Sequence, residues 1–214
     1  MRKYLSVVIL VVFLLIACVA NPQVISVPID YEKAAATNPS NPVKNCNSIQ
    51  VAPANRLWCL LYERERLMKE VAANKYPKKK PIYDGVRELE VLKKIAAISS
   101  KKQLPIRDMQ LYSQIVMDVS RQIQEYWFDS WEKQKITKPL LSLNQIRERI
   151  DQIDKAILDN FVLIRGDRSI SFKQVQNGLR ESLADLAGIH PSHDRELFID
   201  LLTKAIYPVL SGRN

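Results

Sequence analysis

Apolar residues recur every three or four positions through most of the chain after residue 55, and this spacing constrains the fold more than any other feature. The pattern is cleanest between residues 146 and 164. No segment shows the strict alternation of apolar and polar residues that is typical of a half-buried strand. Only five of the 214 residues are glycine, as expected where helices dominate. We therefore predict an all-α fold, a helical bundle of about six helices.

Prolines and capping residues divide the periodic region into six predicted helices, within a helical domain at 55–214. Asp84 is a good N-cap for the second helix. Pro105 can occupy the first turn of the third, and Pro139 precedes the fourth. The predicted helices are 55–75, 84–99, 105–133, a fourth through 146–164, a fifth that carries Phe172, Val175, Leu179, Leu183 and Leu186, and a sixth that starts near Ser192 and carries Leu197, Leu201, Ile206 and Val209.

Residues 1–20 have the organisation of a secretory signal peptide. A short basic start precedes an apolar run at 5–17, which is too short to span a bilayer. Two processing routes are open. Signal peptidase could cleave before Asn21, or the segment Leu15–Cys18 could be a bacterial lipobox in which Cys18 is lipidated. Both routes predict a periplasmic or secreted protein, bound to the membrane only if Cys18 carries a lipid anchor.

Residues 21–54 are rich in Pro, Asn, Ala and Val without a clear period, which predicts an extended leader. Cys46 and Cys59 remain once Cys18 is removed or lipidated. An even pair of cysteines outside the cytosol predicts a disulfide, and two free thiols are the alternative. The cysteine spacing does not fit a zinc site, so we expect no metal.

The net charge of +9 predicts an anionic partner. Nucleic acid, an acidic membrane surface and a small polyanionic substrate all fit the charge alone. Export of the chain argues against nucleic acid and leaves the substrate or the membrane surface.

Two cations interrupt the apolar stripe of the first predicted helix. Arg64 and Lys75 are eleven residues apart, about three helical turns, so both lie on the face that should be buried. A buried cation without a partner is costly, and this placement predicts an anionic counterpart inside the bundle. The alternative is that the long side chains cover the stripe while their charges reach water.

Polar residues also lie near the core positions of the other helices. Ser120 and Gln124 are one turn apart on the third helix, Arg87 precedes Val91 by one turn on the second, and Arg147 flanks the stripe of the fourth. Each residue alone could be an ordinary surface residue. Together they predict an anion pocket lined from four helices.

The fourth helix resembles one helix of the all-helical chorismate mutases. The segment Ile146–Leu158 is similar to the family pattern L-R-x-x-I-D-x-L-D-x-x-L-L, and the segments 65–92 and 117–124 resemble the secreted subclass. The resemblance covers roughly 55–165. The family has an arginine, a lysine eleven residues later and a second arginine twelve residues after the lysine, which match Arg64, Lys75 and Arg87. It also has a hydroxyl residue four positions before a Gln or Glu, which match Ser120 and Gln124. A last arginine three positions before an Ile-Asp pair matches Arg147.

These six residues are the ones that interrupt the apolar stripes, so the resemblance favours the pocket over the surface alternatives. Gln122 also fits the Gln position, but Gln124 fits the four-residue step from Ser120. The resemblance implies a Claisen rearrangement of chorismate, a dicarboxylate, to prephenate, with no cofactor. It also implies a homodimer.

The resemblance further implies a role for each pocket residue. Arg64 and Arg147 would bind the substrate carboxylates, and Arg87 would position the substrate and its developing charge. Lys75 and Gln124 would donate to the ether oxygen, and Ser120 would steady a carboxylate or Gln124. Asp84 either accepts from the ring hydroxyl or serves only as the helix N-cap.

Two other functions remain open. The first is a non-catalytic helical envelope lipoprotein, or an anion-binding protein, on the mutase scaffold. The second is a basic module bound to an acidic membrane or nucleic acid, which should spread its cations along an outer face instead of placing them within apolar stripes.

Overall fold

The computed structural model describes residues 46, 53–133, 136, 139–189 and 193–212, and the predicted signal peptide lies outside them. The six predicted helices and the all-α class are confirmed, and the described residues contain no strand. The α-helices are α4 (Pro53–Arg66), α5 (Met68–Lys75), α6 (Gly85–Lys101), α7 (Ile106–Lys133), α8 (Leu143–Ile164), α9 (Phe172–Ser182) and α10 (His193–Ser211), with a 3₁₀ turn, η1, at Tyr76–Lys78.

The first predicted helix is present as two consecutive segments, α4 and α5. Leu67 separates them, yet its φ of −68° and ψ of −14° are helical. The Val71 N–H donates to the Leu67 carbonyl at 3.0 Å, so the helical path continues. As a result, Arg64 and Lys75 both point into the bundle, where they are 4% and 6% exposed.

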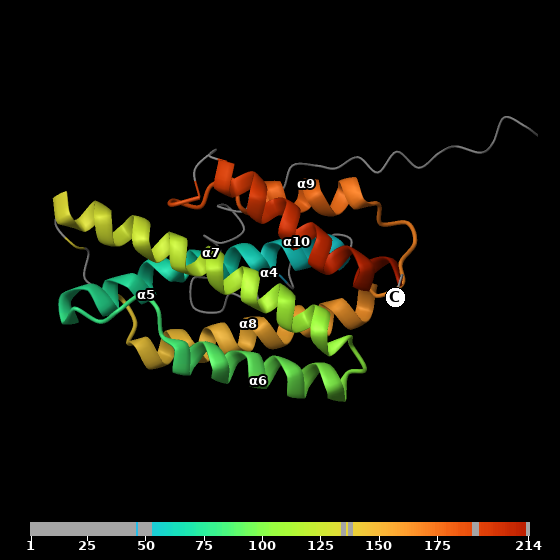
Figure 1. Cartoon of the computed structure of the whole chain (residues 1–214), viewed down its shortest axis with the longest axis horizontal. Helices are drawn as coiled ribbons and strands as arrows, with labels where there is room; N and C mark the ends of the chain where they lie inside the picture. The colour runs from blue at the N-terminus through green and yellow to red at the C-terminus, as the bar shows by residue number, and fades with distance from the viewer. Residues whose placement is uncertain (1–45, 47–52, 134–135, 137–138, 190–192, 213–214) are drawn as a thin grey trace, which may run out of the picture.

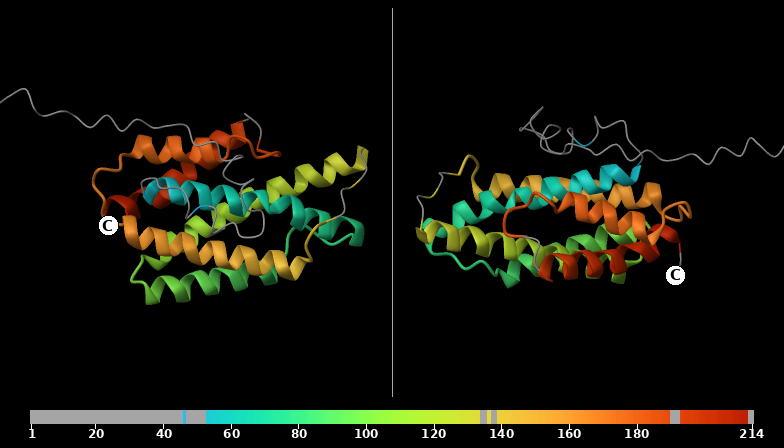
Figure 2. Two further views of the ribbon diagram at one scale, coloured as in Figure 1. Left: turned by 180° about the vertical axis from the view of Figure 1, so that it is seen from behind. Right: turned by 90° about the horizontal axis from the view of Figure 1, so that it is seen from above.

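The helices form three groups across the molecule. In Figure 1, α6 and α8 lie along one edge, α9 lies along the opposite edge, and α4, α5 and α7 run between them. The helix α10 starts near the edge of α9 and crosses obliquely over the molecule. The left view of Figure 2, from behind, shows α6 and α8 along the same edge and α9 along the opposite one. Packing of α4 against α8 and α9, and of α7 against α6 and α10, closes the core around the fully buried Phe161.

Local signals fix where the helices begin. The Asp84 carboxylate accepts from the Arg87 N–H at the start of α6, which confirms the predicted N-cap. Ser142 and Gln145 form a capping box at the start of α8. Pro105 directly precedes α7, and its carbonyl accepts from the Met109 N–H at 3.1 Å.

The predicted stripes of the last two helices are partly wrong. The helix α9 ends at Ser182, so Leu183 and Leu186 are buried in the turn that follows it. On α10, Leu197 and Leu201 are 45% and 38% exposed, and the buried face instead carries Ile199, Leu202, Ile206 and Val209. The first half of α10 carries apolar residues on two sides, so the spacing alone does not decide which side is buried. Packing against α7 and α9 selects one of them.

The predicted disulfide between Cys46 and Cys59 is confirmed, and both cysteines are buried. Because Cys59 lies in α4, the bond fastens Cys46 to that helix. Within the described ranges, no three side chains form a group that could hold a metal ion. None of the helices described is long and apolar enough to cross a membrane.

Replacing Cys46 and Cys59 with alanine should lower the thermal unfolding midpoint. The disulfide closes a loop with a sequence separation of 13 residues. Such a cross-link contributes about 3 kcal/mol in the chain-entropy model. For a domain of this size we expect a fall of roughly 6–12 °C, measured by circular dichroism.

A reductant should lower the midpoint of the native chain and leave that of the double variant unchanged. Equal midpoints for the oxidised and reduced native chain would contradict the stabilising role of the bond.

Candidate active site

A pocket with charged and apolar lining residues opens between α4, α5, α6, α7 and α8. Five cations and two carboxylates contribute to the lining, which favours an anionic ligand. Apolar walls come from residues such as Met68, Val91 and Ile150. The structure brings every residue of the sequence-predicted site to this pocket, namely Arg64, Lys75, Asp84, Arg87, Ser120, Gln124 and Arg147.

Arg64 lies at the buried end of the pocket and holds three neighbours. Its Nε donates to Asp154 of α8 at 2.8 Å, and its Nη1 donates to Glu65 at 2.6 Å and to the Ser120 hydroxyl of α7 at 2.7 Å. Burial lowers the pKa of Arg64, but Asp154 and Glu65 outweigh this effect and raise it. The guanidinium is therefore a fixed cation in a rigid position.

Lys75 projects into the pocket from the last turn of α5. Its Nζ donates to the Ile82 carbonyl at 2.7 Å, which leaves two further N–H donors on the ammonium group. Burial lowers the pKa of Lys75, Asp84 opposes the shift, and Arg147 adds to it. An anionic ligand would replace much of the solvation that this ammonium group has lost.

Arg147 and Arg87 line the more exposed part of the pocket. Arg147 donates to the second carboxylate oxygen of Asp84 at 2.9 Å, which ties α8 to the start of α6. The Arg87 guanidinium donates to Asp151 of α8 at 2.8 Å. Asp84 is thus both the helix cap and the partner of Arg147, so the sequence-based alternatives for this residue were incomplete.

Ser120 and Gln124 project together from α7, as their spacing predicts. The Gln124 Nε2 donates to the Ser120 carbonyl at 3.0 Å and approaches the Met68 sulfur at 3.9 Å. The Gln124 Oε1 is buried and has no hydrogen-bond partner within the described part of the chain. Gln122 instead points towards Asp194 of α10, and it does not line the pocket.

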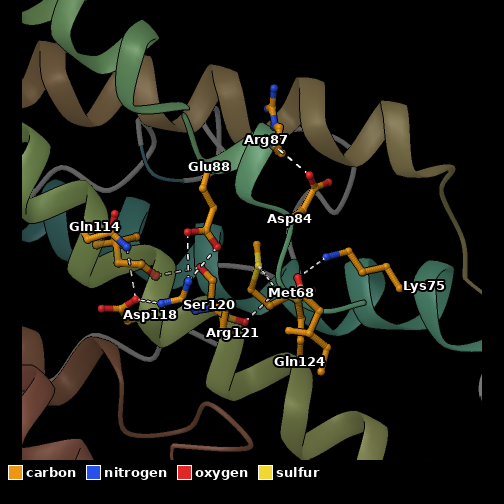
Figure 3. A network of polar contacts seen from close by, with 12 residues as sticks. Met68, Lys75, Asp84, Arg87, Glu88, Gln114, Asp118, Ser120, Arg121 and Gln124 are labelled. Carbon is orange, nitrogen blue, oxygen red and sulfur yellow. Dashed lines mark hydrogen bonds and ion pairs between the residues drawn. The ribbon is translucent and has the colours of Figure 1, made fainter. Parts of the chain in front are cut away.

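Sequence reasoning missed Arg121 and Glu88, which also line the pocket. Arg121 donates to both Glu88 oxygens at 3.0 Å, pairs with Asp118, and lies 5.5 Å from the centre of the Tyr83 ring. Figure 3 shows Glu88 and Asp118 on either side of the Arg121 side chain. The one available signal was the position of Glu88, one turn after Asp84 on α6.

The family model described as chorismate mutase type II matches residues 55–125. Residues 55–125 are therefore similar to the all-helical chorismate mutases. Their fold is also seen in the crystal structure of chorismate mutase from Burkholderia thailandensis, with a TM-score of 0.58 and 16% identity over 72% of this chain and 98% of that one. For chorismate mutase from Burkholderia phymatum the TM-score is 0.57, with 19% identity over 70% of this chain and 93% of the other. None of the curated proteins matches the chain.

The chorismate mutase match ends at residue 125, so it contains every predicted pocket residue except Arg147. The fold supplies Arg147 from α8, whose capping box begins the helix five residues earlier, at Ser142. The ion pair between Arg147 and Asp84 therefore connects α8, which lies outside the matched residues, to the start of α6, which lies within them.

Asp84 can be tested by separating its two contacts. Asp84→Asn keeps a good N-cap and weakens the pairing with Arg147, whereas Asp84→Ala removes both. We expect Asp84→Ala to lose about 1 kcal/mol of unfolding free energy relative to Asp84→Asn, measured by urea denaturation. Equal stabilities of the two variants would show that the cap contributes nothing to α6.

Proposed function

We propose that this chain catalyses the rearrangement of chorismate to prephenate in the pocket described above. One carbon–oxygen bond breaks while one carbon–carbon bond forms, so the reaction requires no nucleophile and no proton transfer. The protein must hold a flexible dicarboxylate in a compact chair and stabilise the negative charge that develops on the ether oxygen. The observation that carries the proposal is the convergence of the six residues predicted from spacing in one pocket, together with Asp84.

The two substrate carboxylates would bind Arg64 and Arg147. A guanidinium binds a carboxylate through two parallel N–H donors, and arginine suits this role better than lysine. Arg64 is already oriented by Asp154 and Glu65, and Arg147 by Asp84. Such preorganisation reduces the cost of ordering these side chains when substrate binds.

Lys75 and Gln124 would donate to the ether oxygen. Lys75 gives one N–H to Ile82 and keeps two others. Gln124 gives one N–H to Ser120 and directs the other at the Met68 sulfur, a weak acceptor that the ether oxygen would replace. Both side chains are buried, at 6% and 5% exposure, so their interaction with a developing charge is weakly screened. Arg87 would position the substrate, and its hydrogen bond to Asp151 would weaken when the substrate binds.

Lys75→Ala and Arg87→Ala should lose most of the activity and keep their helical content. Removing one donor to a developing charge costs about 10²–10³ in kcat. The assay follows the loss of chorismate absorbance with purified protein and no added metal or nucleotide. Lys93→Ala is the matched control, since Lys93 is exposed on α6 outside the pocket.

Absence of turnover above background for the native chain at micromolar concentration would contradict the enzymatic proposal and favour a binding protein on the same scaffold. Full activity of Lys75→Ala would place the chemistry elsewhere.

The kcat of the native chain should be flat across neutral pH, because an amide donates at any pH. It should fall only on the alkaline side, where Lys75 loses its proton at a pKa that burial lowers. Gln124→Glu introduces a buried carboxyl group that donates only when protonated, so kcat should fall roughly tenfold per pH unit above the pKa of that group.

Gln122→Glu is the control for this change, since Gln122 lies outside the pocket. An acid-confined kcat for the native chain, or an unchanged profile for Gln124→Glu, would contradict the role of Gln124.

We also propose that the mutase acts outside the cytoplasm, in the periplasm or after secretion. The signal-like pattern of residues 1–20 supports this proposal, as does the disulfide, which is typical of oxidising compartments. Mass spectrometry of the mature N-terminus distinguishes a lipidated Cys18 from cleavage before Asn21. The homodimer stays a prediction, and light scattering of the purified chain tests it.

A further inference from the structure

Glu65 is a buried carboxyl group for which the proposed mechanism has no role. It is 0% exposed, lies beneath the pocket, and does not line it. Its Oε1 accepts from Arg64 Nη1 at 2.6 Å, and its Oε2 lies 2.9 Å from the Ser120 hydroxyl. Glu65 therefore contacts two of the residues that would hold the substrate.

The charge around Arg64 conflicts with binding an anion there. One guanidinium lies between two acidic side chains, Glu65 and Asp154. With both ionised, the cluster is already net negative before a substrate carboxylate arrives. In a site this buried, like-charge repulsion is poorly screened, so a carboxylate binds Arg64 more tightly when one of the two acids is neutral.

The hydrogen bonds identify Glu65 as the group that can become neutral without losing a contact. Ser120 Oγ lies 2.9 Å from Glu65 Oε2 and 2.9 Å from the Val116 carbonyl. When Glu65 is ionised, Ser120 donates to it. When Glu65 is protonated, its hydroxyl donates to Ser120 Oγ and Ser120 donates to Val116. Arg64 keeps its bond to Oε1 in both states.

The surroundings of Glu65 make its protonation easier than that of a carboxyl group in water. Burial raises the pKa of Glu65, and Asp154 adds to the shift, whereas Arg64 and the Ser120 hydrogen bond oppose it. The other titratable group facing it is Tyr112 of α7, which burial keeps neutral because its pKa is raised. Asp154 is more exposed, with 15% of its side chain accessible to water.

We propose that Glu65 is a positioning residue that takes up one proton from solvent when a substrate carboxylate binds to Arg64. The proton resides on Oε2 and leaves with the product. Neutral Glu65 still holds Arg64 and Ser120 in place, but it no longer competes for the charge of Arg64. The identity of the dicarboxylate rests on the proposed function. The proton uptake does not depend on it.

The kinetic test compares the native chain with Glu65→Gln, whose amide reproduces the hydrogen bonds of the neutral acid. From about pH 5 to about pH 9, the KM of the native chain for chorismate should rise, approaching tenfold per pH unit above the pKa of Glu65. The KM of Glu65→Gln should lose this dependence. The effect should fall on KM and not on kcat, which a merely structural role would not produce.

Glu63→Gln is the matched control. Glu63 is also buried, at 1% exposure, and burial raises its pKa, but it pairs with Arg66 and does not line the pocket. Its KM should follow that of the native chain. A flat KM for the native chain, or the same pH dependence in Glu65→Gln, would overturn the proposal.

Calorimetry provides a second readout that does not need turnover. Prephenate is titrated into the native chain in two buffers of different ionisation enthalpy, slightly above the pKa of Glu65. Equal binding enthalpies would overturn the proposal, and a difference that vanishes in Glu65→Gln supports it. Proton uptake without turnover of chorismate would contradict the proposed function alone.

Discussion

The buried ion pairs of Arg64 are the interaction on which the pocket depends. The guanidinium joins α4 to α7 through Ser120 and to α8 through Asp154, and Glu65 holds it from its own helix. Removing one partner of such a pair lowers the free energy of unfolding by about 3–5 kcal/mol, because the other charge is left buried without a counter-ion. The same contacts set the spacing of the three helices, so stability and the shape of the pocket share one origin.

The inward direction of the pocket residues could be predicted from the sequence because it depends on local geometry. Arg64 and Lys75 lie on one face of a helix at 3.6 residues per turn, whatever the rest of the chain does. The cap at Asp84 and the disulfide between Cys46 and Cys59 follow from equally local or compositional signals. The resemblance then related these separate positions to one site.

The partners of the pocket cations could not be predicted, because they depend on which helices meet. Asp154 is 90 residues from Arg64, and Asp151 is 64 residues from Arg87. Glu65 adjoins Arg64 in sequence, yet only packing shows that its carboxylate turns inwards to Ser120. The same limit explains the error on α10, where Leu197 and Ile199 both fit an apolar face and packing buried Ile199.

A structure of the chain with a non-reactive dicarboxylate that mimics the compact chair would show whether this pocket binds the substrate. The mimic should lie between α4, α5, α6, α7 and α8, with its carboxylates on Arg64 and Arg147. Its ether oxygen should lie within hydrogen-bond distance of Lys75 and Gln124. A mimic bound elsewhere, or bound in this pocket without contact to Lys75 and Arg64, would contradict the proposed function.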